Sequence, residues 1–390
     1  MDYELSPRER AWREEVRGFI SAHVDDALAD ETRARGNEGR GPLALAFLEA
    51  LKARGWWGLA WPQEYGGLGK SAIEQWIFID EIESAGAPML PLTVTSVAPT
   101  IMRIGNEDQK QDWLPRIQDG EIEFALGYSE AEAGTDLASL RTQAVLDGDE
   151  WVVSGAKMWN TMAHHATHNW LAVRTEPDAR KHKGISMMIV PMDAPGVSVQ
   201  PIWVWPGLRT NAVFFDDVRV PRSYLIGERG MGFYYAAMAL NFERLSIGSI
   251  GMARCHFRAL VDEVRTRVVD GRPLREVPWV RERLARLQVE IDAAGMLGLQ
   301  TAWAQDQGGV PAAESSMAKI QVSELSQRIA DEGCEILGLN GQLHADDERA
   351  LAGGRMQWLY RLSPMLAFGG GTNEVQRDII GFMGLGLPRK

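Results

Sequence analysis

The sequence predicts an α+β multidomain protein in which a β-rich segment lies between two helical segments. Apolar residues recur at helical spacing in the first third, short runs of β-forming residues fill the middle third, and long helical patterns return in the last third. Because 390 residues exceed the roughly 150 that are typical of one domain, we expect three domains. They are an N-terminal helical domain over 1–122, a β domain over 123–231 and a C-terminal helical bundle over 232–390.

The first helix is predicted by Ser6-Pro7-Arg8-Glu9, a capping box with proline at the first helical position. The apolar residues that follow it at helical spacing are Trp12, Val16, Phe19, Ile20 and Val24. Further helices are expected around residues 43–54, 73–84 and 108–118.

The middle third contains four apolar runs that are rich in β-forming residues and are separated by Asp-Gly or Pro. These runs, which predict strands, are residues 151–155, 170–173, 185–190 and 212–215. From residue 232 onward the pattern is helical again. The long stretches 234–269, 279–307 and 315–337 predict helices that pack in an antiparallel bundle.

Composition and charge exclude several classes of function. The chain has 41 Lys and Arg against 53 Asp and Glu, a net charge of −12, which argues against binding to nucleic acid or to an anionic membrane. Its two cysteines cannot build a disulfide framework or a cysteine-rich metal site. No apolar signal segment and no run of about 18 apolar residues occurs. We therefore expect a cytoplasmic protein without membrane insertion.

Three histidines, His164, His165 and His168, lie close together without an acidic partner for a zinc motif. We expect them to be solvated or structural, and we expect no metal site.

Two segments carry candidate cofactor-binding residues. In the loop 127–136, small residues leave backbone N–H groups open and Ser129 and Thr135 add hydroxyls, which suits a pyrophosphate. A turn capped by Thr135 or Asp136 would explain the same residues. In the segment 157–161, a continued extended backbone would point Trp159 and Thr161 to one face, where they could contact a planar heteroaromatic cofactor. A tryptophan in the core is the alternative.

Two further segments combine unusual residues with helical signals. Glu243 lies in an otherwise apolar helical pattern, so burial could raise its pKa toward that of a working base, although a solvated Glu-Arg helix face is the alternative. The glycines 369–371 precede a helix start at Thr372 or Asn373. They could let a ligand reach backbone N–H groups at that helix end, or they could form a flexible connector.

Taken together and in this order, these segments resemble the acyl-CoA dehydrogenase family of flavoproteins over essentially the whole chain. The stretches 55–67, 218–228 and 317–319 also resemble this family. The resemblance implies an N-terminal helical domain, a middle β-barrel and a C-terminal four-helix bundle. It also implies FAD as the cofactor, an acyl-CoA substrate, and electron-transferring flavoprotein or a similar acceptor as the partner.

The resemblance further implies roles for individual residues. The FAD contacts would be Leu126, Ser129, Thr135, Trp159 against the isoalloxazine, Thr161 near flavin N5, and Thr372 and Glu374 at the adenine-nucleotide half, commonly across a subunit boundary. The acyl-CoA contacts would be Thr135, Asn241, Arg244, Gly370 and Gly371, with the backbone N–H of Gly370 donating to the thioester oxygen.

The catalytic base occupies one of two positions in this family. Many members carry a glutamate immediately before Gly-Thr in the C-terminal motif, where this chain has Gly370. Isovaleryl- and long-chain acyl-CoA dehydrogenases carry it on a bundle helix before Arg-Leu, which matches Glu243. The implied reaction is α,β-dehydrogenation of a CoA thioester to a 2-enoyl-CoA, with Glu243 removing the α-proton.

Several departures from the family pattern concern the nucleotide end of FAD. Ala131 stands in place of a proline, Glu335 and Leu339 replace a glutamine and a glycine, and the Arg-x-x-Phe-Gly motif is missing. Because a neighbouring subunit supplies these positions, either a homotetramer or an α2β2 heterotetramer is expected. The overall pattern resembles bacterial members that act on bulky acyl-CoA substrates, such as steroid side-chain or dicarboxylyl esters. Two alternatives are an oxygen-using acyl-CoA oxidase or flavin monooxygenase of the same superfamily, and a partner subunit with an incomplete FAD site.

Overall fold

The computed structural model describes residues 3–35, 41–242 and 244–388, and the chain forms two compact units. The helical unit comprises residues 1–48, 70–89 and 244–390, and the sheet unit comprises residues 49–69 and 90–243. Each unit contains residues from more than one predicted domain, and the two predicted domain boundaries stay a prediction. The predicted order of a helical, a β and a second helical segment is confirmed.

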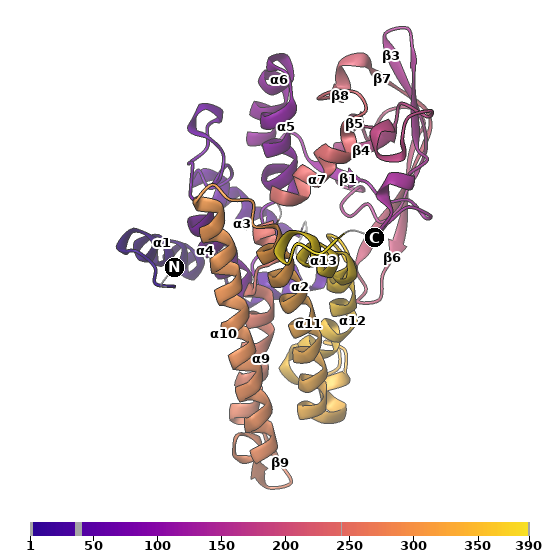
Figure 1. Ribbon diagram of the computed structural model, residues 1–390. Helices are drawn as coiled ribbons and strands as arrows, with labels where there is room; N and C mark the ends of the chain where they lie inside the picture. Colours follow the sequence, from indigo (N-terminus) through magenta and orange to yellow (C-terminus); the bar gives the residue numbers. More distant parts are fainter. Residues whose placement is uncertain (1–2, 36–40, 243, 389–390) are drawn as a thin grey trace. The chain divides into compact units, whose positions relative to one another are not determined.

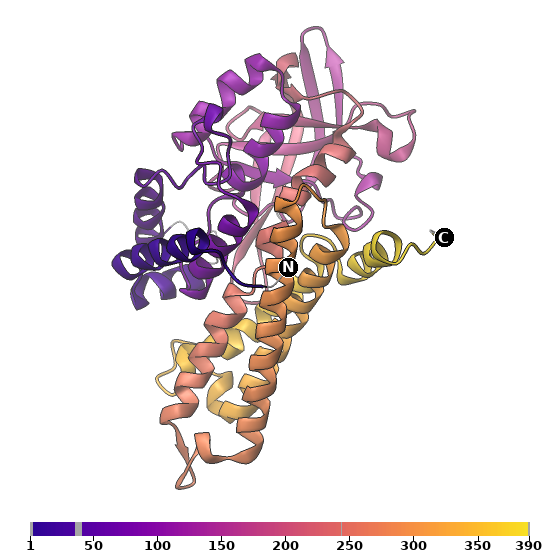
Figure 2. The same ribbon diagram turned by 60° about the vertical axis from the view of Figure 1, so that its left-hand side comes forward.

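The helical unit contains most of the long helices, and α9, α10 and α11 run side by side in it (Figures 1 and 2). Its helices are α1 (Pro7–His23), α2 (Asp26–Arg35), the first half of α3 (Pro42–Ala53), α4 (Ala72–Ser84), α8 (Arg244–Ile247), α9 (Gly251–Thr266), α10 (Pro278–Asp306), α11 (Ala312–Leu337), α12 (Arg355–Phe368) and α13 (Asn373–Ile379). A short hairpin of β9 (Val268–Val269) and β10 (Arg272–Pro273) follows α9.

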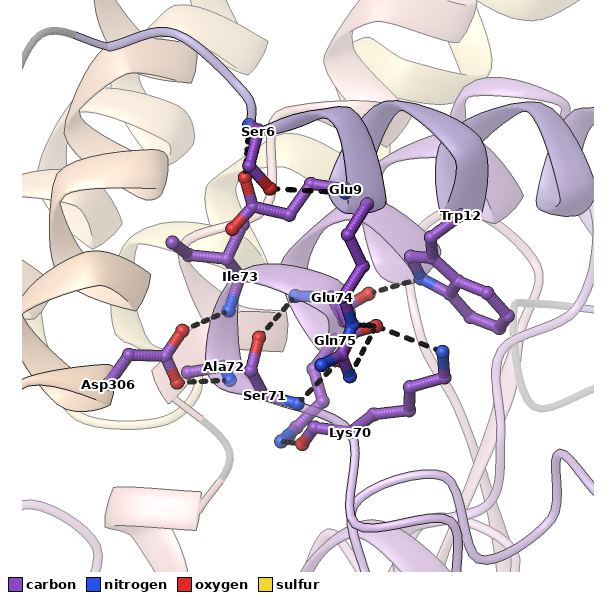
Figure 3. A network of polar contacts seen from close by, with 11 residues as sticks. Ser6, Glu9, Trp12, Lys70, Ser71, Ala72, Ile73, Glu74, Gln75 and Asp306 are labelled. Carbon is purple, nitrogen blue, oxygen red and sulfur yellow. Dashed lines mark hydrogen bonds and ion pairs between the residues drawn. The ribbon is translucent and has the colours of Figure 1, made fainter.

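The predicted capping box at the start of α1 is confirmed (Figure 3). The Ser6 hydroxyl accepts the Glu9 N–H at 3.3 Å, and the Glu9 carboxylate accepts the Ser6 N–H at 2.6 Å. A second box, Ser71 with Glu74, starts α4. Reciprocal bonds of this kind satisfy N–H groups that have no partner inside the helix, so the sequence determines where both helices begin.

Polar contacts also join α4 to its neighbours (Figure 3). Asp306, at the end of α10, accepts the N–H groups of Ala72 and Ile73 at 2.6 and 3.1 Å. The Trp12 indole of α1 donates to the Glu74 carbonyl at 2.8 Å. These contacts fix α1 and α10 to α4 and define the frame of the helical unit.

The sheet unit is built on an eight-stranded sheet, with α7 (Gly232–Phe242) against β4 and β5 (Figure 1). Its strands are β1 (Phe124–Gly127), β2 (Gln143–Asp147), β3 (Glu150–Lys157), β4 (His168–Arg174), β5 (Ile185–Pro191), β6 (Val197–Trp203), β7 (Arg209–Pro221) and β8 (Leu225–Ile226). The strand order is β6-β7-β3-β2-β4-β5-β8, and β1 pairs in parallel with β4. The π-helical turn Thr93–Val97, α5 (Ala98–Ile104) and α6 (Glu107–Gln118) complete the unit.

The four predicted strand runs lie in β3, β4, β5 and β7, and the six helices predicted outside 234–269 also form. The expectation of one helix over 234–269 is wrong, because α7, α8 and α9 replace it. Gly248 forms a turn, and the Ser249 hydroxyl accepts the Gly251 N–H at 3.2 Å, which starts α9 as a new helix. Among the described residues, no helix is both long and apolar enough to cross a membrane.

Candidate functional site

The loop that follows β1 exposes Thr135, whereas Ser129 is half-buried. Leu126 lies in β1 opposite Trp170 of β4. At Gly127 a Cβ would stand 2.2 Å from Asn169 Oδ1, so only glycine fits the close approach of these strands. Glu130 and Ala133 then exchange two backbone hydrogen bonds, and this tight turn leaves the following residues, including Thr135, exposed.

A buried ion pair connects this loop to β3. The Lys157 side chain is completely buried, and its Nζ donates to the Glu130 carboxylate at 2.9 Å and to the Tyr128 carbonyl at 3.0 Å. Burial lowers the pKa of Lys157 to about 8, an effect that Glu130 opposes. Burial would also raise the pKa of Glu130, but the Lys157 charge and hydrogen bonds from Thr142 and Arg141 hold it below its usual value.

Trp159 differs from both sequence-based expectations. Strand β3 ends at Lys157, and Trp159 adopts a left-handed conformation with φ of +64°, so the expected extended backbone over 157–161 is wrong. The ring is not in the core, because 54% of Trp159 is exposed. The Thr161 N–H bonds to the Trp159 carbonyl at 3.0 Å, so a tight turn, not strand alternation, positions Thr161.

Backbone and asparagine hydrogen bonds surround this turn. The Met158 N–H donates to the Ser129 carbonyl at 2.9 Å, which brings the two predicted cofactor-binding segments together. Asn160 is buried, and its N–H donates to the Asn211 carbonyl at 2.9 Å. The Asn211 amide in turn donates to the Asn160 carbonyl at 2.8 Å.

The three histidines have structural contacts. The Asn211 amide lies 3.1 Å from His164 Nδ1, and burial lowers the pKa of His164 to about 4, so the neutral ring accepts this hydrogen bond. His168 packs edge-on against Trp113, with ring centroids 5.2 Å apart. His165 lies beside the His164 ring. In the part of the chain that the structure describes, no cluster of three His, Cys, Asp or Glu side chains is arranged to hold a metal ion.

The predicted substrate-binding residues around the end of α7 are only partly described. Asn241 belongs to α7 and Arg244 begins α8. Glu243, the predicted base, lies outside the described residues. Its assignment therefore stays a prediction.

The glycine segment before α13 belongs to the helical unit. α12 ends at Phe368, and Gly370 and Gly371 have φ of +66° and +99°, conformations that glycine adopts without strain. The Thr372 hydroxyl accepts the Val375 N–H at 3.2 Å and caps α13, so the predicted helix start is confirmed. Glu374 is exposed in the first turn of α13.

A buried lysine also holds this second segment. Lys319 of α11 donates to the Ala367 carbonyl at 3.0 Å and to Asn373 Oδ1 at 2.7 Å. Burial lowers the pKa of Lys319 to about 8, an effect that the carboxylates of Glu374 and Glu324 oppose. Lys319 thus bonds on both sides of the glycines 369–371.

Sequence reasoning missed the residues that hold these segments. Lys157 follows Trp151 and Val153 at spacings of two residues on the buried face of β3, so strand alternation could have placed it inside. No sequence signal joins Lys157 to Glu130 or Asn160 to Asn211, because these contacts join separate strands and loops.

The two departures from the family's nucleotide-contacting motif also have defined surroundings. Arg283 of α10 forms ion pairs with Glu335 and with Glu332, the latter at 2.7 Å, and its guanidinium lies 5.0 Å from the Trp279 ring centroid. Leu339 is 82% exposed. An engaged carboxylate therefore stands where the family has a neutral glutamine.

Comparisons with known proteins cover the whole chain. The acyl-CoA dehydrogenase N-terminal, middle and C-terminal domains match residues 6–121, 125–218 and 230–383. Acyl-CoA dehydrogenase FadE26 of Mycobacterium tuberculosis is 39% identical over 398 residues, which cover 100% of this chain and 99% of FadE26. FadE29 of the same organism is 37% identical, with the same coverage.

Solved structures agree with these relatives. The Tcur3481-Tcur3483 steroid ACAD superposes with a TM-score of 0.92 at 36% identity, and the ChsE4-ChsE5 complex from Mycobacterium tuberculosis with a TM-score of 0.91 at 39% identity. Both comparisons cover 100% of this chain and 100% of the other. The chain therefore belongs to the acyl-CoA dehydrogenase family and is a FAD-dependent oxidoreductase that acts on a CH–CH bond of an acyl-CoA.

Proposed function

We propose that this chain catalyses the α,β-dehydrogenation of a bulky, steroid-type acyl-CoA, with Glu243 as the base. The observation that carries the proposal is the hydrogen bond from the Met158 N–H to the Ser129 carbonyl, which holds the loop 127–136 next to the turn that exposes the Trp159 ring. An exposed indole on a strained backbone contributes little to the stability of the protein alone. Its ring could instead pack against a planar aromatic cofactor. The name "steroid ACAD" of one similar structure supports the substrate class.

The residues of the chain fit FAD in chemical type. Trp159 offers an aromatic face, and Ser129, Thr135 and Thr161 offer hydroxyls for polar edges and phosphates. Thr372 and Glu374 would contact the adenine-nucleotide half. When bound, FAD supplies the acceptor for the β-hydrogen and its electron pair.

The remaining chemistry belongs to the chain itself. Glu243 takes the α-proton as the Cα–H bond breaks, and the thioester oxygen then gathers negative charge. The backbone N–H of Gly370 donates to that oxygen, and such a fixed donor stabilises the charge in a site from which water is excluded. Asn241, Arg244 and Gly371 would border the acyl-CoA, as would Thr135. Electron-transferring flavoprotein, or a similar acceptor, would reoxidise the enzyme, and a cytoplasmic location stays a prediction.

The test is anaerobic reduction of the bound flavin by an acyl-CoA, compared between wild type and Glu243→Gln. We expect the variant to lose about 100- to 10,000-fold in reduction rate, the usual contribution of a general base, with unchanged FAD content. Glu228→Gln, at an exposed position, is the control and should behave as wild type. A Glu243→Gln variant that is reduced at the wild-type rate would rule out this assignment.

A second candidate is a heteromeric enzyme in which this chain contributes unequally to the FAD sites. The carboxylates of Glu335 and Glu332 favour it, because they share the single charge of Arg283 and so leave negative charge where the family pattern has a neutral glutamine at the nucleotide end of FAD. The name of the ChsE4-ChsE5 complex describes two different components. The test is the ratio of FAD to chains in the purified assembly, weighed by light scattering. One FAD per chain in a homotetramer would exclude this candidate.

A further inference from the structure

The Lys157 ammonium is a buried charge that no ligand at the protein surface could contact. No part of its side chain is exposed to solvent. Removing a charge from water is costly unless hydrogen bonds and a counter-charge replace the water. The Glu130 carboxylate supplies that counter-charge, and it also accepts the N–H groups of Arg141 and Thr142 at 2.7 and 2.9 Å. The pair is therefore built into the start of β2.

Three hydrogen bonds join the loop at 128–130 to the end of β3. Lys157 Nζ bonds to the Tyr128 carbonyl and to the Glu130 carboxylate, and the Met158 N–H bonds to the Ser129 carbonyl between them. Ser129 is thus fixed from both sides. Trp159 directly follows Met158, the residue after β3 that takes part in these bonds.

The backbone at Trp159 needs such support. A left-handed φ is unfavourable for any residue with a Cβ, and it persists only where the surroundings impose it. Lys157 and Met158 fix the backbone before Trp159. After it, Asn160 donates from its N–H to the Asn211 carbonyl and from its side chain to the Met158 carbonyl at 3.2 Å.

We propose that Lys157 is a positioning residue for the flavin: with Glu130, it sets the distance between the Ser129 loop and the Trp159 turn and holds the indole ring in its orientation. Lys157 acts only through these residues, since its own side chain is enclosed. The inference rests on the proposed function of the same site. Asn160 and Asn211 support the turn from its other side.

The experiment compares Lys157→Met with wild type in the purified holoenzyme. We expect the FAD dissociation constant to rise at least tenfold, and the visible circular dichroism of the remaining bound flavin to change, because that signal reports the orientation of its protein surroundings. Lys183→Met, at an exposed position of the same unit, is the matched control and should change neither quantity.

Lys157→Met leaves the half-buried Glu130 carboxylate without its counter-charge, and it could fail to fold. The double variant Lys157→Met, Glu130→Gln removes both charges and keeps an acceptor for a backbone N–H, and replacing both partners of a buried pair is often tolerated. We expect this folded double variant to show the same altered flavin dichroism and weaker FAD binding. A purely structural pair would lower the melting temperature but leave both flavin signals of the folded protein unchanged.

The outcomes separate two failures. If wild type holds FAD and either folded variant keeps the wild-type dissociation constant and dichroism, the positioning role is wrong while the proposed function stands. If the wild-type assembly binds no FAD at all, the proposed function fails, and this inference fails with it.

Discussion

Each compact unit has a buried lysine that holds a candidate binding segment, but the two lysines have different partners. Lys157 holds the loop 127–136 in the sheet unit, and Lys319 holds the glycines 369–371 in the helical unit. Lys157 in the sheet unit and Lys319 in the helical unit each donate to a backbone carbonyl and to a side-chain oxygen, and burial lowers the pKa of each to about 8. The side-chain acceptor of Lys157 is the Glu130 carboxylate, whereas that of Lys319 is the Asn373 amide. Lys157 is therefore held by an oppositely charged side chain, whereas Lys319 is held by a neutral one.

The segments that they hold also differ in strain. In the segment that Lys319 holds, the residues with a left-handed backbone are Gly370 and Gly371. After Lys157, the left-handed position is Trp159. A glycine segment needs little force to keep its shape, whereas a left-handed tryptophan must be held. The lysine that is paired with a carboxylate therefore lies beside the strained residue.

The largest effect is expected from breaking the ion pair between Lys157 and Glu130. Lys157→Met should lower the free energy of unfolding by about 3–5 kcal/mol, because it removes the counter-charge of the Glu130 carboxylate, whose side chain is only 11% exposed. Chemical denaturation measures this value, and the double variant with Glu130→Gln should recover part of it. A loss below about 1 kcal/mol, the level typical of exposed pairs, would contradict the comparison.

Removing the Lys319 hydrogen bonds should lower the free energy of unfolding by less. Lys319→Met removes hydrogen bonds from a charged donor, worth about 2–3 kcal/mol, but it leaves no unpaired carboxylate. Asn373 Oδ1 keeps the Ser323 hydroxyl at 3.2 Å as a partner. The same denaturation experiment checks this value. A larger loss than that of Lys157→Met would show that the counter-ion does not set the difference.

Glu83 extends the comparison to a half-buried carboxylate that has no ammonium partner among the groups that set its pKa. Burial raises the pKa of Glu83 to about 7, opposed by a hydrogen bond from Ser249 and reinforced by Asp80. A raised pKa stabilises the fold below pH 4.5 and loses that contribution as pH rises through 7. Wild type should therefore lose about 2 kcal/mol between pH 5 and pH 7 through this group.

Glu83→Gln should abolish that part of the pH dependence, and Glu49→Gln, at an exposed position, should keep it. Denaturation curves at several pH values measure both. If Glu83→Gln and wild type show parallel stability profiles over pH 5 to 7, Glu83 titrates normally.

The smallest expected effect concerns strain at Trp159. Glycine adopts a left-handed φ freely, whereas alanine does not, so Trp159→Gly should be more stable than Trp159→Ala by about 1 kcal/mol. Both variants lose the ring, so the difference isolates the backbone. Gly370→Ala in the helical unit should lose a similar amount. Equal stability of the two Trp159 variants would show that the turn is unstrained.

Much of the fold could be predicted from local patterns. The capping box at Ser6 and helical periodicity located α1, α10 and α11, and β-forming runs located β3 and β5. The four-residue strand β1 has too few residues to show alternation, and Pro201 interrupts the pattern of β6. The break between α7 and α9 depends on a turn at Gly248 that periodicity does not show.

The site was less accessible to sequence reasoning. Ser129, Trp159 and Thr372 could be selected from residue types and family resemblance, but the left-handed turn at Trp159 depends on partners far away in the sequence. Asn211, for instance, lies 51 residues beyond Asn160. Such contacts leave no local pattern, so the anchors appeared only in the structure.

The most direct test of this account is the visible absorption spectrum of the purified assembly, recorded before and after anaerobic addition of a steroid-type acyl-CoA. We expect a yellow protein whose flavin band is bleached by that thioester, and less by a short linear one. A colourless assembly, or a flavin that no acyl-CoA bleaches, would contradict the central claim that this chain contributes to a working flavin site for an acyl-CoA.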